Sequence, residues 1–466
     1  MREQLLHCDR RDLAKSAKKD LKINLKFYFS HPLLLKRFKT QHTLNPHLGI
    51  SWNFANFAYY VNFPEEMNLD KFVKDHVIER QESLFLKDIE DNKEKLDKSI
   101  RGKSVLVIGG AGTIGTSFIK ALLPFEPAEL VVVDLNENGL AELTRDLRSS
   151  SDLKVPPVFL TYTLDFTDPI LGDIFRDHGG FDIVANFSAH KHVRSEKDKY
   201  SVEALLKNNV IKAKKLLDLL KVYKPEHFFC VSTDKAANPV NVMGASKRVM
   251  EDLIMSYKSD FNVTTARFAN VAFSNGSLPA SFFDRMMKNQ PLVAPSDVRR
   301  YFVSMEESGQ ICMLACILGN SGEVFFSRLG ENKMKTFSEI CDAFLSEMGY
   351  KKHECGSDDE AKCFAAANLP GDTYPVVYFK SDTTGEKDFE EFYVEGETVD
   401  MERFRSLGVI THTDNKPREE VNNLIDSLEA LFHDRSFTKA DVVECLESYL
   451  PNFRHEEKGR NLDDKM

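Results

Sequence analysis

An apolar run that ends directly in a glycine triplet constrains the fold of this chain more than any other feature. The run SVLVIGG (104–110) is continuous, which is typical of a strand buried on both faces of a parallel sheet. Gly109, Gly112 and Gly115 follow at a spacing of three, and a helical segment extends from there through residue 124. Glycine permits a tight turn and a close approach of two backbones. The segment therefore predicts a strand, a tight turn and a helix in immediate succession.

Five more apolar runs follow at intervals, with helical segments between most of them. They are ELVVVDL (129–135), VFLTYTLD (158–165), FDIVANFSA (181–189), HFFCVSTD (227–234) and VTTARFANV (263–271). Regular alternation of strand and helix is typical of parallel sheets covered by helices on both faces. We therefore expect an α/β fold with a Rossmann-type doubly wound parallel sheet.

The length of 466 residues is too great for one compact domain. We expect an N-terminal region of unknown role (1–100), a Rossmann domain (101–275), a smaller substrate-binding lobe interleaved with it (276–395) and a helical C-terminal extension (396–466). The N-terminal region contains an aromatic stretch (49–63) with the single tryptophan, Trp52. Packing is a better explanation of this stretch than a ligand surface, because aromatic side chains dominate core burial.

The charge and cysteine pattern narrows the class of protein. A net charge of −10 argues against general nucleic-acid binding. Residues 1–40 are basic, with 11 Lys and Arg against 4 Asp and Glu; a solvated helix face explains them better than contact with an anionic membrane. The eight cysteines form no CxxC pair and suit reduced thiols in a cytoplasmic protein. No apolar run reaches the length of a membrane span.

The glycine triplet predicts a dinucleotide site. Thr113, Ile114 and Gly115 begin the following helix, whose N–H groups and dipole favour phosphate. Asp134 ends the second strand, 19 residues after Gly115, where a carboxylate accepts hydrogen bonds from the adenosine ribose and repels a 2′-phosphate. This favours NAD over NADP; the alternative is three turn glycines with no ligand. Asp165 is a candidate partner of the adenine amino group, or a helix N-cap.

The segment VSTDKAANPVNVMGASKR (231–248) resembles the nucleotide-sugar 4,6-dehydratases of the extended short-chain dehydrogenase/reductase superfamily. Three more segments resemble this family, from about residue 75 to about residue 395: ANFSAHKHV (185–193), RFANVAFSNGSLP (267–279) and TTGEKDFEEF (383–392). One departure matters, because Met243 stands where the superfamily has its catalytic tyrosine, four residues before Lys247. A thioether cannot deprotonate a hydroxyl. A subset of the family, the enzymes that open bacillosamine-type pathways, also carries methionine there.

The resemblance implies roles for individual residues. Lys235 would be the base at C5 of the sugar, Asp234 the acid at O6, Lys247 the group that holds the nicotinamide ribose, and Thr233 a hydrogen-bond partner of O4. We expect the Asp234 and Lys235 side chains to point apart, because an ion pair would oppose both roles. The remaining assignments are Ser188 and Ala189 for the cofactor, and Lys191, Met243, Asn270, Ser277, Arg300 and Glu386 for the substrate.

Two assignments have competing explanations. Arg300 suits either a diphosphate or an interdomain salt bridge. His190 and His192 lie one residue apart without other ligand types beside them, which argues against a metal. The pattern as a whole favours NAD-dependent 4,6-dehydration of a UDP-N-acetylhexosamine, most simply UDP-GlcNAc, for a surface glycan, by a homo-oligomer. The alternatives are a nucleotide-sugar epimerase of the same superfamily and a non-catalytic NAD-binding protein.

Overall fold

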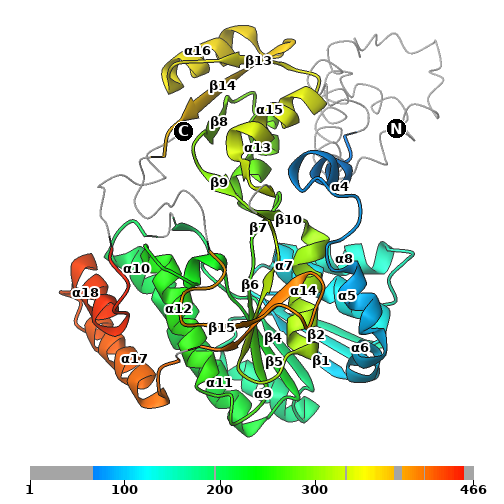
Figure 1. Ribbon diagram of the computed structural model, residues 1–466, viewed down its shortest axis with the longest axis vertical. Coiled ribbons are helices and arrows are strands. Elements are labelled where there is room, and N and C mark those ends of the chain that lie inside the picture. Colours follow the sequence, from blue (N-terminus) through cyan, green and yellow to red (C-terminus); the bar gives the residue numbers. More distant parts are fainter. Residues whose placement is uncertain (1–66, 194–195, 331–332, 382–390, 414, 456–466) are drawn as a thin grey trace, which may run out of the picture. The chain divides into compact units, whose positions relative to one another are not determined.

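The computed structural model describes residues 67–193, 196–330, 333–381, 391–413 and 415–455 (Figure 1). All of these residues belong to one compact unit, Val61–Met466. The basic segment (1–40) and the aromatic stretch with Trp52 therefore lie outside the described residues.

This unit is built on a nine-stranded sheet in the order β15-β16-β11-β6-β5-β4-β1-β2-β3. Its six strands from β3 to β6 have the order 3-2-1-4-5-6 and are all parallel, which is the doubly wound Rossmann arrangement. All six predicted strands are present, and the predicted fold is confirmed. Their bounds are β1 Ser104–Ile108, β2 Glu129–Asp134, β3 Val158–Thr163, β4 Ile183–Asn186, β5 His227–Val231 and β6 Val263–Arg267.

Three later strands widen this sheet beyond β6. β11 (Glu323–Ser327) pairs with β6 in parallel, and β16 (Leu407–His412) and β15 (Thr398–Asp400) continue it antiparallel. The prediction of a helical extension from residue 396 is therefore wrong at its start. The run LGVITH is short and rich in apolar residues, a pattern that periodicity alone cannot assign to a strand or a helix. The sheet edge offered by β11 decides it.

Helices surround the sheet, either packed on it or on another helix. They are α5 Leu86–Asp91, α6 Lys93–Ile100, α7 Thr113–Leu122, α8 Glu137–Ser149, α9 Pro169–His178, α10 Lys199–Leu206, α11 Lys212–Val222, α12 Val242–Met255, α14 Met305–Leu318, α17 Arg418–His433 and α18 Lys439–Tyr449. α14 is buried almost all round and lies against α7. A Cβ at Gly309 of α14 would lie 2.1 Å from the carbonyl oxygen of Ser117, so these two helices pack backbone against backbone.

A smaller lobe contains a parallel sheet in the order β13-β14-β8. Its elements are β8 Leu292–Pro295, β13 Lys351–Glu354, β14 Thr373–Phe379, α13 Leu278–Met287, α15 Phe337–Glu347 and α16 Asp358–Asn368. Two short strand pairs accompany it: β7 Asn270–Val271 with β10 Phe302–Val303, and β9 Arg299–Arg300 with β12 Lys335–Thr336. The lobe has its own core, centred on Phe273, Phe282 and Phe344.

Residues 67–100 do not form a region of their own. Phe72 and Val77, from the first described helical segments α4 (Leu69–Phe72) and Val73–Val77, are buried in the core of the smaller lobe. Leu96 and Ile100 of α6 are buried in the core of the large sheet. The predicted boundary at residue 100 therefore needs correction, because apolar side chains before it serve both cores.

The helix lengths and the cysteines of the described part can be compared with the sequence-based expectations. None of the helices in the described ranges is both long and apolar enough to span a bilayer. The seven cysteines in this part are unpaired, and five of them are buried.

Candidate active site

The glycine loop joins β1 to α7 in the predicted way. Gly109 has a φ of +73°, and a Cβ there would lie 2.7 Å from the backbone nitrogen of Ser188. A Cβ at Gly115 would lie 2.4 Å from the carbonyl oxygen of Gly109. Gly112 is the N-cap of α7, and no side chain caps this helix. The loop is thus tightly folded, and the first turn of α7 presents N–H groups to a ligand such as a phosphate.

Asp134 lies at the carboxyl end of β2 and holds the glycine loop. Its Oδ2 accepts a hydrogen bond from the backbone nitrogen of Ala111 at 3.0 Å, and its Oδ1 accepts one from Asn136 N at 2.9 Å. A carboxylate has about four lone-pair sites, so two stay available to ribose hydroxyls. The residue predicted to recognise the ribose therefore also fixes the loop that faces the phosphates.

Asp165 follows β3 and is already engaged. Its carboxylate accepts hydrogen bonds from Thr167 N at 2.9 Å and Thr167 Oγ1 at 2.7 Å, and it pairs with Lys212. Burial opposes its ionisation, but these partners hold its pKa below the ordinary value. The N-cap of α9 is Asp168, whose Oδ1 accepts from Ile170 N. The N-cap alternative for Asp165 is therefore wrong, and its role towards adenine stays a prediction.

The loop after β4 lies against the glycine loop. Phe187 N donates to Ile108 O at 2.7 Å, and Ser188 N donates to Asn186 Oδ1 at 3.0 Å. Ser188 and Ala189 are half-buried, next to the Gly109 turn. Because β4 lies between β1 and β5, this loop leaves the sheet between the predicted cofactor and catalytic segments.

Thr233, Asp234 and Lys235 leave the carboxyl end of β5 in a short 3-10 turn (Asp234–Ala236). Asp234 is 4% exposed, and its Oδ1 accepts hydrogen bonds from Thr233 Oγ1 at 2.8 Å and Lys235 Nζ at 2.9 Å. The expectation that the Asp234 and Lys235 side chains point apart is therefore wrong. Opposite charges on neighbouring residues attract strongly where little water separates them, and the tight turn brings them within reach.

Lys247 lies on α12 behind this turn. Its Nζ donates to Val231 O, at the end of β5, at 3.0 Å, and only 3% of the residue is exposed. Burial lowers the pKa of its ammonium group. Met243, one turn earlier, is 2% exposed and belongs to the main core. A Cβ at Gly244 would lie 2.6 Å from Lys235 O, so glycine is needed to bring α12 against the turn.

The predicted substrate residues come from the loops between the sheet and the smaller lobe. Lys191 Nζ donates to Asn275 O at 2.9 Å, and Asn275 N donates to Thr113 Oγ1 at 3.0 Å, so three separate segments meet at the start of α7. Ser277 is the N-cap of α13. Asn270 of β7 pairs with Phe302 of β10.

Arg300 and Glu386 are the last two residues predicted to bind substrate. Arg300 is 5% exposed, and its Nη1 donates to Arg299 O at 2.9 Å. Glu386 lies outside the described residues. The substrate assignments of both residues stay predictions.

The sequence analysis did not identify the buried residues that connect the segments of the candidate site to one another. Asn209 accepts from His190 N at 2.8 Å and donates to His190 O and Ser246 Oγ, both at 3.0 Å, so it links the loop after β4 to α12. The signal for it was a pair of asparagines inside an amphipathic helical segment. Asn209 is only 2% exposed, and a buried amide needs partners.

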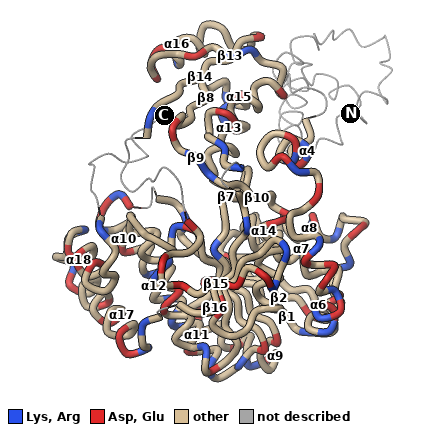
Figure 2. Tube along the Cα trace, viewed as in Figure 1, with Lys and Arg blue, Asp and Glu red and all other residues tan. Residues whose placement is uncertain are grey.

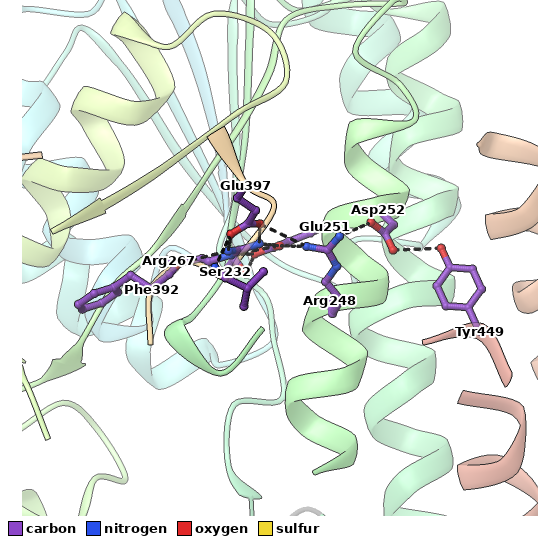
Figure 3. Close-up of polar contacts among 9 residues, drawn as sticks. Ser232, Arg248, Glu251, Asp252, Arg267, Phe392, Glu397 and Tyr449 are labelled. Atoms are coloured by element: carbon purple, nitrogen blue, oxygen red, sulfur yellow. Dashed lines mark hydrogen bonds and ion pairs between the residues drawn. The ribbon is translucent and has the colours of Figure 1, made fainter. Parts of the chain in front are cut away.

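A buried network of charges joins β6, α12 and the segment that follows residue 391 (Figure 3). Arg267 is fully buried, and its Nη2 contacts Glu251 Oε2 at 2.7 Å and Glu397 Oε1 at 2.9 Å. Ser232 Oγ donates to Glu251 at 2.5 Å. Burial opposes ionisation of Glu251, but Arg267 holds its pKa below the ordinary value. The residue before Thr233 is thereby anchored to α12.

Asp252, in the same network, predicts a pH dependence of stability. It is 1% exposed, lies 3.3 Å from Arg248, and accepts from Tyr449 at 3.2 Å; burial raises its pKa from 3.8 to about 6. Because the folded protein holds this proton more tightly, the stability from Asp252 is lost as the pH rises through the folded pKa. Between about pH 5 and about pH 8, we expect the free energy of unfolding of wild type to fall by about 1.4 kcal/mol relative to that of Asp252→Asn. Urea unfolding of both proteins measures this, and parallel pH profiles would contradict it.

No metal was predicted in the sequence. In the described part of the chain, His353, Cys355 and Glu360 of the smaller lobe place ligand atoms within 4.8 Å of one another. Glu360 is exposed and already accepts a hydrogen bond from Gly356 N at 2.8 Å. We assign this group no ion, and the absence of a metal from the reaction stays a prediction.

The doubly wound sheet, the glycine loop on α7 and the polar turn after β5 together define a Rossmann-type protein. The family of polysaccharide biosynthesis proteins matches residues 105–411, and the chain belongs to this family. The predicted family resemblance is thereby confirmed.

Three similar proteins illustrate the range of relatives. An uncharacterised membrane protein of Methanocaldococcus jannaschii is 30% identical over 319 residues, covering 66% of this chain and 86% of that protein. The inverting UDP-N-acetylglucosamine 4,6-dehydratase of Campylobacter jejuni is 26% identical over 279 residues, covering 55% and 79%. The crystal structure of Pen from Bacillus thuringiensis is similar with a TM-score of 0.55 at 20% identity, covering 71% of this chain and 99% of that one, which supports the fold.

Proposed function

We propose that this protein is an NAD-dependent 4,6-dehydratase of a UDP-N-acetylhexosamine, with UDP-GlcNAc as the first substrate to test. The observation that carries the proposal is the position of Thr233, Asp234 and Lys235. They stand at the carboxyl end of β5, in front of Lys247, two strands from the glycine loop. Ligands of doubly wound sheets bind at this edge. The name of the Campylobacter relative supports this reaction class.

The glycine loop fits a dinucleotide, because the cradle at Gly109 and Gly115 has no room for a Cβ and α7 has no side-chain cap. Gly112, Thr113 and Ile114 would hold the pyrophosphate, Asp134 the adenosine ribose, and Lys247 the nicotinamide ribose. When bound, NAD would supply the hydride acceptor for oxidation at C4 and the hydride donor for reduction at C6, with no net consumption of the cofactor.

The residues of the turn then divide the proton transfers. Thr233 would hydrogen-bond O4 in place of the missing tyrosine and pass the O4 proton on to water, and the ammonium of Lys247 would favour this loss. A ketone at C4 acidifies the C5 proton, which the Lys235 amine removes. Asp234 protonates the departing C6 hydroxyl, and water leaves; Lys235 then returns a proton to C5 as hydride adds at C6. Met243 shapes the pocket and transfers no proton.

The observed Asp234–Lys235 ion pair gives this scheme one requirement. An ion pair stabilises the carboxylate and the ammonium, whereas the reaction needs a carboxylic acid and a free amine. Bound substrate must therefore insert between the two groups, remove water from around them and break their contact. The Thr233 hydroxyl, which donates to the same Asp234 oxygen, would be released towards O4 in the same movement.

The test is incubation of the purified full chain with UDP-GlcNAc and NAD in D2O. The expected product is lighter by one water and carries one deuterium at C5, read by mass spectrometry and proton NMR. Unchanged mass with altered stereochemistry at C4 would show an epimerase instead. Simple C4 epimerisation normally uses the tyrosine that Met243 replaces and needs no acid at C6, so the residues present favour dehydration. No consumption of any nucleotide sugar would support a non-catalytic NAD-binding protein.

A further inference from the structure

The two C-terminal helices, α17 and α18, pack together, and α17 packs against α12, the helix that carries Met243 and Lys247 (Figure 1). They span residues 418–449 and lie beyond residue 411, where the family match ends. These two helices and α12 carry charged residues along their length (Figure 2). Their apolar side chains join the main hydrophobic core, and a small set of polar and ionic contacts ties them to α12 and to the loop before α10.

Glu196 is the centre of the first contact. Only 3% of its side chain is exposed, and its Oε2 accepts a hydrogen bond from Val242 N, the first residue of α12, at 2.7 Å. The N-cap residue Asn241 accepts from Gly244 N at 2.7 Å. Two of the first N–H groups of α12 are therefore satisfied by side chains, and a carboxylate at this end also complements the helix dipole.

The carboxylate of Glu196 is in turn held by the C-terminal segment. Its Oε1 contacts Nε2 of His455, just after α18. Lys439, the first residue of α18, donates from Nζ to the backbone oxygen of Glu196 at 3.1 Å and lies 3.7 Å from Oε1. A buried carboxylate is costly without such partners. His455 and Lys439 thus keep Glu196 where it binds Val242.

The same two helices also hold the other end of α12. Tyr449 of α18 donates to Asp252 at 3.2 Å, and Arg418 of α17 donates from Nε to Ser256 O, at the C-cap of α12, at 3.1 Å. Arg418 also pairs with Asp260 at 2.5 Å. A cation at the C-terminus of a helix complements its dipole. Both ends of α12 are therefore tied to one structural element.

We propose that the C-terminal helix pair clamps α12 through Glu196, and that His455 and Lys439 are positioning residues for the site that α12 carries. Val242 directly precedes Met243, and Lys247 lies on the next turn. A shift of this first turn moves both residues relative to β5 and the glycine loop. The catalytic consequence rests on the function proposed above, whereas the mechanical link between His455 and the start of α12 does not.

The test compares His455→Ala with Arg435→Ala in the full chain by hydrogen–deuterium exchange of backbone amides. Arg435 joins the same helix pair to Glu203 of α10 at 2.9 Å and does not touch Glu196, so it is the matched control. Amides of residues 242–247 are expected to exchange about tenfold faster in His455→Ala and within about twofold of wild type in Arg435→Ala. Equal exchange in the two variants overturns the clamp.

Two further variants separate positioning from general stability. His455→Gln places an amide N–H donor where Nε2 lies, and is expected to restore wild-type exchange. Lys439→Met serves if His455→Ala fails to fold, with the same expected rise in exchange. With turnover established for wild type, kcat is expected to fall about tenfold or more in His455→Ala while KM changes less than about threefold. An inactive wild type would refute the proposed function and leave the exchange result standing.

Discussion

The Lys235→Ala variant is expected to lose turnover by about 10²- to 10⁴-fold while its affinity for NAD stays within about threefold of wild type. Lys235 is the residue proposed to remove the C5 proton, and alanine has no group that replaces an amine. The proposed NAD site is formed by the glycine loop and Asp134, whereas the Nζ of Lys235 donates to Asp234. Steady-state kinetics with UDP-GlcNAc and calorimetric titration with NAD measure the two effects separately.

Lys235→Arg is the matched variant for this prediction. Arginine keeps a positive charge beside Asp234 but cannot give up its proton, so it preserves the ion pair and removes the base. We expect Lys235→Arg to be as inactive as Lys235→Ala. Full activity in Lys235→Ala would overturn the assignment of the base. Full activity in Lys235→Arg alone would show that the positive charge, and not proton removal, is what the reaction needs.

Gly115→Ala and Gly112→Ala are expected to fail in different ways. A Cβ at Gly115 would lie 2.4 Å from Gly109 O and 2.7 Å from Gly110 Cα, both rigid backbone atoms. We expect this variant to lose about 1–3 kcal/mol of unfolding free energy and, with the loop displaced, its measurable NAD binding. Urea unfolding and calorimetric titration test both effects, and wild-type stability would contradict the steric argument.

A Cβ at Gly112 meets nothing closer than 3.4 Å, and its φ of −77° suits any residue. Gly112→Ala is therefore expected to cost less than about 1 kcal/mol of stability, the difference between glycine and alanine as an N-cap. Its NAD affinity is expected to fall about tenfold or more, because the methyl group occupies the place where the pyrophosphate approaches α7. Wild-type NAD affinity in Gly112→Ala would show that no phosphate lies against this residue.

The presence of the six central strands follows from local features of the chain. Strands buried on both faces must be continuous apolar runs, and only short turns and helices separate these runs. The glycine at 109 adds a conformational requirement that few other residues meet, because its φ is positive. Such features act over a few residues and can be recognised without knowledge of the rest of the chain.

The candidate site was predictable as far as its residues are neighbours in the sequence. Thr233, Asp234 and Lys235 were expected at the end of a strand and are found there. The contact between Asp234 and Lys235 was not expected, because the sequence does not show how tightly the turn closes or how far Asp234 is buried. In the folded protein, the attraction between these two charged groups holds their side chains together, whereas the proposed proton transfers need them apart.

By itself, the sequence determined the strand that leads into a glycine turn, the helix after it, and the polar turn that follows β5, because each depends on residues close together in the chain. Only the tertiary structure decided which distant residues meet. Arg267 pairs with Glu397, 130 residues later, and Glu196 with His455, 259 residues later. Lys, Arg, Asp and Glu are common throughout this chain, so their types do not specify partners. The partners are selected when the sheet brings β6, α12 and the C-terminal helices together and removes water from the charges between them.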